Sequence, residues 1–84
     1  MDLVLTPMKV ATGETGEGRL VLLGDRLVAV LVRLSDLHDG HDGWWFIEKG
    51  FGPLDRPQHP MFPDIASAEA WLKAELADQP RWQG

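Results

Sequence analysis

The stretch RLVLLGDRLVAVLVRL, residues 19–34, decides the fold because it reads as a β-hairpin made of two aliphatic runs. Gly24 and Asp25 separate the runs, and glycine at the first position of a two-residue turn favours a type II′ turn, which needs a positive φ there. The turn predicts strands over about residues 19–23 and 26–34. It also predicts the cross-strand partners, which are Leu23 with Arg26, Leu22 with Leu27, Val21 with Val28, and Leu20 with Ala29.

The second of these strands is apolar on both faces. Because side chains alternate along a strand, one face is expected to hold Leu27, Ala29 and Leu31, and the other Val28, Val30, Val32 and Leu34. A strand with one solvated face would alternate apolar with polar residues instead. The pattern therefore predicts a central strand that is covered on both sides.

The next strand is expected in WWFIEKGF, residues 44–51. It should span about residues 43–49, and it again carries large side chains on both faces. Alternation separates these side chains into two pairs, Trp44 with Phe46 and Trp45 with Ile47.

The N-terminal segment MDLVLTPMKVA, residues 1–11, indicates a further strand that proline interrupts. A strand is expected near residues 8–11, with an earlier extended piece at residues 3–5. Because proline donates no ladder hydrogen bond, Pro7 places this region at the edge of the sheet.

The C-terminal part predicts an irregular connection followed by one helix. Residues 50–63, GFGPLDRPQHPMFP, contain four prolines and two glycines, which continue neither a strand nor a helix. Asp64 is a suitable N-cap, and Pro80 ends the helix near residue 78. Apolar residues recur at helical spacing, namely Ile65, Ala68, Leu72 and Leu76, with Trp71 beside them.

Together these elements predict one small domain over residues 1–84 with an α+β fold. Its antiparallel sheet has three to four strands in the order β-β-β-β-α, and the amphipathic C-terminal helix packs on one face. A helix of about 13 residues is about 20 Å long and covers one face of a sheet about 19 Å wide. The second face must then be covered by residues 50–63 or by another protein chain.

A two-fold homodimer is the favoured expectation for that second face, and a different protein partner is the alternative. Tryptophan is enriched at protein interfaces, and the valines of residues 26–34 belong to a strand that is apolar on both sides. The residues expected at the interface are Trp44, Trp45, Val28, Val30 and Val32.

Charge and composition argue against several classes of partner. The formal net charge is −5, and residues 34–84 hold the whole excess, with nine acids against four bases. An acidic chain repels phosphate backbones and anionic membrane surfaces, so neither nucleic acid nor a membrane is expected as a partner. The chain has no cysteine and shows no secretory signal, which favours a cytoplasmic location.

The segment SDLHDGHDGWW, residues 35–45, repeats His-Asp-Gly and raises a metal hypothesis. Nitrogen and oxygen ligands suited to zinc, nickel or manganese are offered by Asp36, His38, Asp39 and His41. Asp42 could add an oxygen and His59 a third nitrogen. The spacing matches neither a structural zinc site nor an EF-hand, and aspartate and glycine also suit a tight turn. An acidic turn is therefore the preferred interpretation, and no cofactor is expected.

No catalytic constellation stands out in the sequence. Neither Ser35 nor Ser67 lies in a G-x-S-x-G motif, and TGETGEG, residues 12–18, lacks the Lys-Ser/Thr end of a phosphate-binding loop. The sequence predicts a non-enzymatic interaction or accessory module that self-associates through an apolar sheet face. Two alternatives stay open: a metal-binding protein that uses loop 36–42, and a peptide- or protein-binding module that adds a strand at the sheet edge near Pro7.

Overall fold

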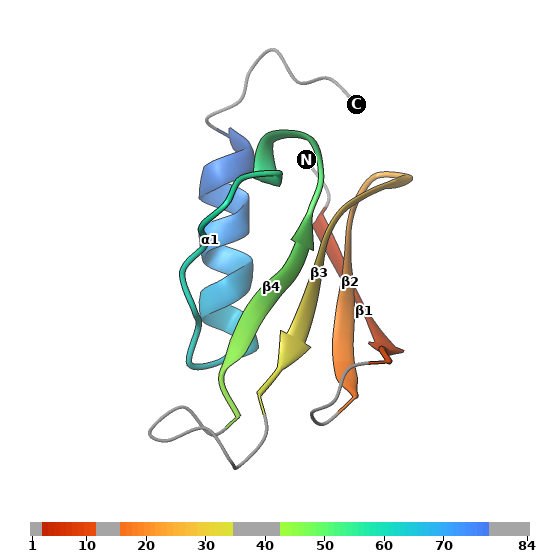
Figure 1. The fold of residues 1–84 in the computed structure, drawn as a ribbon. Helices are drawn as coiled ribbons and strands as arrows, with labels where there is room; N and C mark the ends of the chain where they lie inside the picture. The colour runs from red at the N-terminus through yellow and green to blue at the C-terminus, as the bar shows by residue number, and fades with distance from the viewer. Residues whose placement is uncertain (1–2, 12–15, 35–42, 78–84) are drawn as a thin grey trace.

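The computed structural model describes residues 3–11, 16–34 and 43–77, and Figure 1 shows four strands followed by one helix. The strands are β1 (Leu3–Lys9), β2 (Glu17–Leu23), β3 (Arg26–Arg33) and β4 (Trp45–Gly50). A short 3-10 helix, η1 (Gly52–Leu54), and the helix α1 (Ile65–Ala77) follow. The sheet is antiparallel throughout, in the order β1-β2-β3-β4, so the predicted α+β fold is confirmed.

The hairpin of β2 and β3 has the turn that its sequence predicts. Gly24 has a φ of 65°, and no described non-glycine residue has a positive φ, which fits the type II′ turn. Next to the turn, Leu23 pairs with Arg26 and Leu22 with Leu27, as expected. The glycine therefore sets the two aliphatic runs side by side.

Beyond the turn, the hairpin departs from the predicted register. A bulge between Val21 and Leu22 shifts every later pair by one residue, so Val21 faces Ala29 and not Val28 as predicted. The extra residue, Val28, is fully buried together with Ala29 in the core under the helix. Leu27 was expected on the same face as Ala29, but the bulge turns it to the opposite face.

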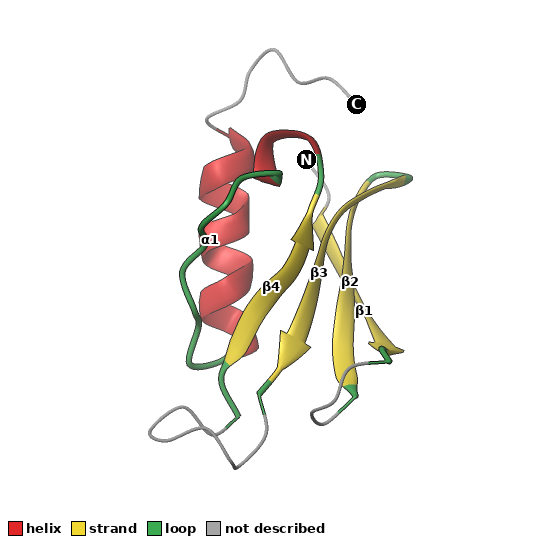
Figure 2. Ribbon diagram, viewed as in Figure 1, coloured by secondary structure: helices red, strands yellow, loops and turns green. Residues whose placement is uncertain are grey.

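A second bulge lies between β3 and β4. Val30 pairs with Lys49 and Leu31 with Ile47, which leaves Glu48 as the extra residue on β4. Bulges strengthen the right-handed twist of a sheet. Figure 2 shows the resulting twist from β1 to β4.

β1 forms one edge of the sheet, as Pro7 predicts. It is a single strand over Leu3–Lys9, where the sequence indicated two shorter pieces, and Pro7 pairs with Arg19 inside it. The Val10 N–H donates to the Gly16 carbonyl at 2.8 Å, so these two residues form a hydrogen-bonded pair. Along an antiparallel ladder, hydrogen-bonded pairs alternate with pairs that are not hydrogen-bonded. By that alternation the main-chain groups of Pro7 point out of the sheet, so its missing N–H costs no ladder hydrogen bond.

The connection between β4 and α1 packs on the helix side of the sheet. Leu54 is fully buried and Phe62 nearly so, in the same core as α1. Phe62 exchanges two main-chain hydrogen bonds with Trp45, at 2.7 and 2.9 Å, and thereby extends the sheet beyond β4. Arg56 forms an ion pair with Glu75 on α1. This connection therefore does not cover the opposite face of the sheet.

α1 buries the side that its periodicity predicts. Ala68, Leu72 and Leu76 are almost fully buried, and the ring of the partly buried Trp71 lies 5.6 Å from the ring of Phe62. They share one core with the strand residues Val21, Val28, Ala29, Leu31, Trp45 and Ile47. α1 has 13 residues, and within the described ranges no helix has the length and apolarity to cross a membrane.

Asp64 caps α1, and its ionisation makes the stability of the fold depend on pH. The main-chain N–H of Ser67 donates to the Asp64 Oδ1 at 2.7 Å. This bond, followed by one with the Ser67 side chain, holds the pKa of Asp64 below its ordinary value of 3.8. Because the pKa is lowered in the folded state, the stabilisation is present above pH 3.8 and is lost as the pH falls through the folded-state pKa.

We expect Asp64→Ala to lower the melting temperature at neutral pH. Asp64→Asn should lower it less, because asparagine keeps an oxygen that accepts the Ser67 N–H. The difference between Asp64→Ala and the wild type should shrink as the pH falls from neutral through the lowered folded-state pKa of Asp64. Thermal unfolding of the three proteins over a series of pH values from neutral into acid measures this, and a difference that does not diminish in acid would contradict it.

Candidate functional site

The sheet has one face under α1 and one face opposite to it, which we call the open face. Figure 2 shows α1 and the connection before it on the same side of the sheet. Strand pairing and alternation assign to the open face the side chains that point away from α1. They are Val4, Thr6 and Met8 of β1, Leu20 and Leu22 of β2, Leu27, Val30 and Val32 of β3, and Phe46 and Lys49 of β4.

The open face is almost entirely apolar. Val4 is 51% exposed, Met8 46% and Leu27 38%. Thr6 and Lys49 are the polar members of the set defined above. The half-buried apolar members of the set are Leu20, Leu22, Val30 and Phe46, and Val32 is 0% exposed. Large apolar side chains from all four strands therefore lie together on one surface.

The five residues predicted at an interface lie on different faces of the sheet. Val28 and Trp45 belong to the core under α1, and they are 0% and 5% exposed. Val30 and Val32 lie on the open face, where Val30 is half-buried and Val32 is 0% exposed. The half-buried Trp44 alternates with Trp45 and so points the same way. The bulge turns Val28 inward, and alternation separates the two tryptophans. The structure thus brings Trp44, Val30 and Val32 to one face and not all five residues.

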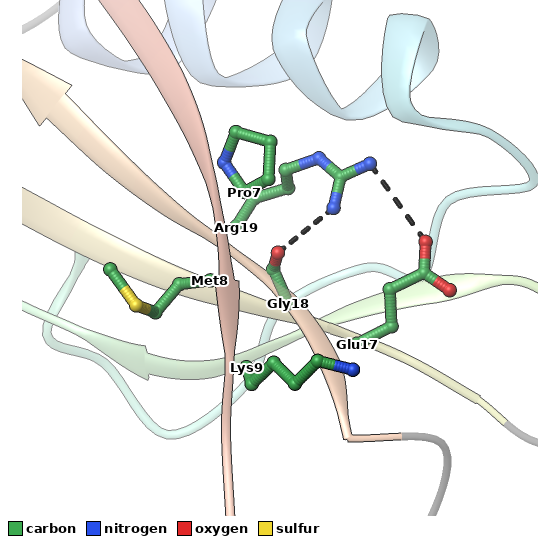
Figure 3. A pocket seen from close by; sticks show the side chains of 6 residues that line it. All are labelled: Pro7, Met8, Lys9, Glu17, Gly18 and Arg19. Atoms are coloured by element: carbon green, nitrogen blue, oxygen red, sulfur yellow. Dashed lines mark hydrogen bonds and ion pairs between the residues drawn. The ribbon is translucent and has the colours of Figure 1, made fainter.

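A second candidate is an open depression at the ends of β1 and β2. Figure 3 shows the six residues that line it, which are Pro7, Met8, Lys9, Glu17, Gly18 and Arg19. A carboxylate oxygen of Glu17 lies 3.9 Å from Arg19 and the other 3.0 Å from Arg33. Arg19 also donates to the Gly18 carbonyl at 2.9 Å and stacks 4.9 Å from the ring centroid of Trp45. Glu17, Arg19 and Arg33 therefore pair with one another, and Arg19 covers the ring of the core residue Trp45, which is a structural role.

The predicted metal ligands Asp36, His38, Asp39 and His41 lie outside the described residues. His59 lies inside them, and its Nε2 is 2.7 Å from the Leu54 carbonyl oxygen. Because a carbonyl only accepts, this ring nitrogen carries the proton and donates it to the bond. His59 therefore helps to hold the connection before α1. Across residues 3–11, 16–34 and 43–77, no group of three or more His, Cys, Asp or Glu side chains is placed to hold a metal ion.

The chain was compared with known protein families, curated proteins and solved structures. No family model matches it. No curated protein and no solved structure matches it either. On physical grounds the open face is the stronger candidate site, because its exposed apolar side chains lower their free energy when they leave water. In the depression, by contrast, Glu17 already pairs with Arg19 and with the neighbouring Arg33.

Proposed function

We propose that this chain is a small non-enzymatic interaction module that binds protein through the open face. One observation carries the proposal: α1 and the connection before it both pack on the other side of the sheet. Val4, Met8 and Leu27 of the open face therefore keep 38–51% of their surface in water. Their transfer into a protein contact yields about 25 cal/mol per Å² of apolar surface.

The size of the open face supports a binding role. Four strands about 4.8 Å apart and seven residues long, at about 3.3 Å per residue, span an area of roughly 440 Å². The largest apolar patch on a typical monomeric protein measures about 300–600 Å² and is often functional. The open face lies within that range, and Lys49 is the single charged member of the set that defines it.

Binding by strand addition at the edge of β1 has less support. The outward-directed main-chain groups of β1 belong to Leu3, Leu5, Pro7 and Lys9, by the alternation of the ladder. Pro7 has no N–H, so a strand that paired along this edge would lose a hydrogen bond near its middle. The opposite edge, that of β4, already carries the bridge between Trp45 and Phe62. Contact through the face of the sheet avoids both obstacles.

Site-specific photo-crosslinking in the cells that produce the protein tests this proposal. A benzophenone amino acid is placed at Val4 or Met8 on the open face, and at Ala74 on the exposed side of α1 as a control. We expect discrete covalent adducts from Val4 and Met8 and none from Ala74. Mass spectrometry then identifies the partner chain. Equal adduct patterns at all three positions, or none at the open face, would rule out the open face as the binding surface.

A further inference from the structure

We infer that the partner on the open face is a second copy of this chain, and that the two sheets pack face to face as a two-layer β-sandwich. This inference rests on the proposed function and names the partner of the same surface. A two-fold pair uses the same patch on both copies, so the patch must be complementary to itself. The size of the open face and the distribution of its charges are both compatible with such a pair.

The area of the open face corresponds to a small, weakly associating dimer. Two open faces of roughly 440 Å² each give a flat contact area of about 900 Å², without the additional surface that projecting side chains contribute. A stable, specific protein interface buries about 1,000 Å² or more in total, so the expected contact is slightly smaller and has the size of a weak, transient interface. Dissociation in the micromolar range is the corresponding expectation.

The distribution of charge allows two acidic chains to meet at this face. Each chain has a formal net charge of −5, which opposes association in general. The charges of the strand ends, however, lie on the helix side, where Glu17 pairs with Arg19 and Arg33. The paired residues that define the open face include no acid. Glu48, the exposed extra residue next to Lys49 in β4, stands outside this set, and its carboxylate has to stay in water at the rim of the contact.

The remaining charge on the open face can stay at the rim of the contact. Lys49 is exposed, and its amine lies 5.6 Å from the ring centroid of Phe51, just after the end of β4. A lysine can pack its aliphatic stem against apolar surface and keep its amine in water. Facing sheets in such sandwiches lie about 10 Å apart with their strands about 30° from parallel. That spacing lets the exposed Val4, Met8 and Leu27 of each copy interdigitate with the partner sheet.

Sedimentation of the full chain over about 1–300 µM measures the association directly. The wild type should convert from monomer to dimer within this range. The Val4→Glu/Met8→Glu double variant should dissociate at least tenfold more readily, because it brings carboxylates into the contact. Met61→Glu is the matched control, since Met61 is 39% exposed but lies in the connection that packs on the helix side. Circular dichroism of all three proteins checks that the double variant still folds.

The outcomes separate this inference from the proposed function. A dimer that the double variant leaves unchanged, or that Met61→Glu weakens equally, overturns the face-to-face pair. A wild type that stays monomeric also overturns it, and a soluble paramagnetic probe then reports on the methyl groups of Val4, Leu20 and Val30. Strong broadening of these signals shows an accessible face, so the interaction function stands with a different protein as partner. Protected signals show that the chain covers its own face, and both proposals fall.

Discussion

Replacement of Gly50 by alanine is expected to lower the free energy of unfolding by about 3 kcal/mol, at the upper end of the cost of overpacking a core. A Cβ at Gly50 would lie 2.0 Å from the carbonyl oxygen of Leu54 and 2.6 Å from its carbonyl carbon. Both atoms belong to the main chain, so no rotation of a side chain relieves the clash. The turn of η1 has to move away, and it takes the fully buried Leu54 side chain out of the core.

Gly24→Ala is the matched control for this substitution. Nothing lies within 4 Å of a Cβ at Gly24, but its φ of 65° is one that residues with a side chain rarely adopt. Its expected cost is about 1 kcal/mol, which reflects the backbone conformation alone. Urea unfolding of both variants gives the two free energies. Equal costs would show that the chain around Leu54 yields easily to the added methyl group.

Trp45→Ala is expected to lower the free energy of unfolding by about 3–5 kcal/mol, as the loss of a large core side chain does. Trp45 is 5% exposed, and Arg19 stacks on its ring. Its main chain is the anchor for Phe62, which leads into α1. A domain of this size is stabilised by roughly 4–12 kcal/mol in total, so the milder Trp45→Leu should be prepared alongside.

Trp44→Ala provides the comparison, because Trp44 is half-buried and directed toward the open face. Unfolding should be measured at a protein concentration at which the wild type is monomeric, so that association adds nothing to the stability. Under those conditions Trp44→Ala should cost clearly less than Trp45→Ala. The reverse order would place Trp44 in the core and Trp45 outside it.

Local signals in the sequence predict the elements of this fold well. The glycine-aspartate turn, the proline of the edge strand and the capped amphipathic helix each act within a few residues, and the structure confirms all three. The bulge at Val28 leaves no such local signal. A shift of one residue in strand pairing normally turns the apolar side chains of a strand from the core to solvent, and the free-energy cost of that exposure fixes the register. β3 is aliphatic on both faces, so the penalty is weak and the pattern favours neither register.

The candidate site could be predicted only in part, for the same reason. The excess of apolar surface follows from the two-sided pattern, but the face of each residue depends on the bulge, which carries Val28 into the core. The side on which the proline-rich connection packs depends on contacts between distant residues, such as Arg56 with Glu75. The cluster of Glu17, Arg19 and Arg33 likewise forms only through the pairing of β2 with β3. The spacing of residues in the sequence does not indicate these contacts, because they join residues that are far apart along the chain.

The outward-pointing Pro7 and the bridge of Phe62 to β4 together limit how far molecules of this kind can polymerise. Growth of a sheet from copy to copy, as in amyloid fibrils, needs unpaired strand edges on both sides. Here Pro7 interrupts the row of main-chain N–H donors along the β1 edge. At the other edge, the main chain of Phe62 already pairs with Trp45 at the start of β4. A pair joined through the open faces would therefore be a closed assembly with no free surface of the same kind left for a third copy. Concentrated solutions should hold discrete particles of one size and not filaments.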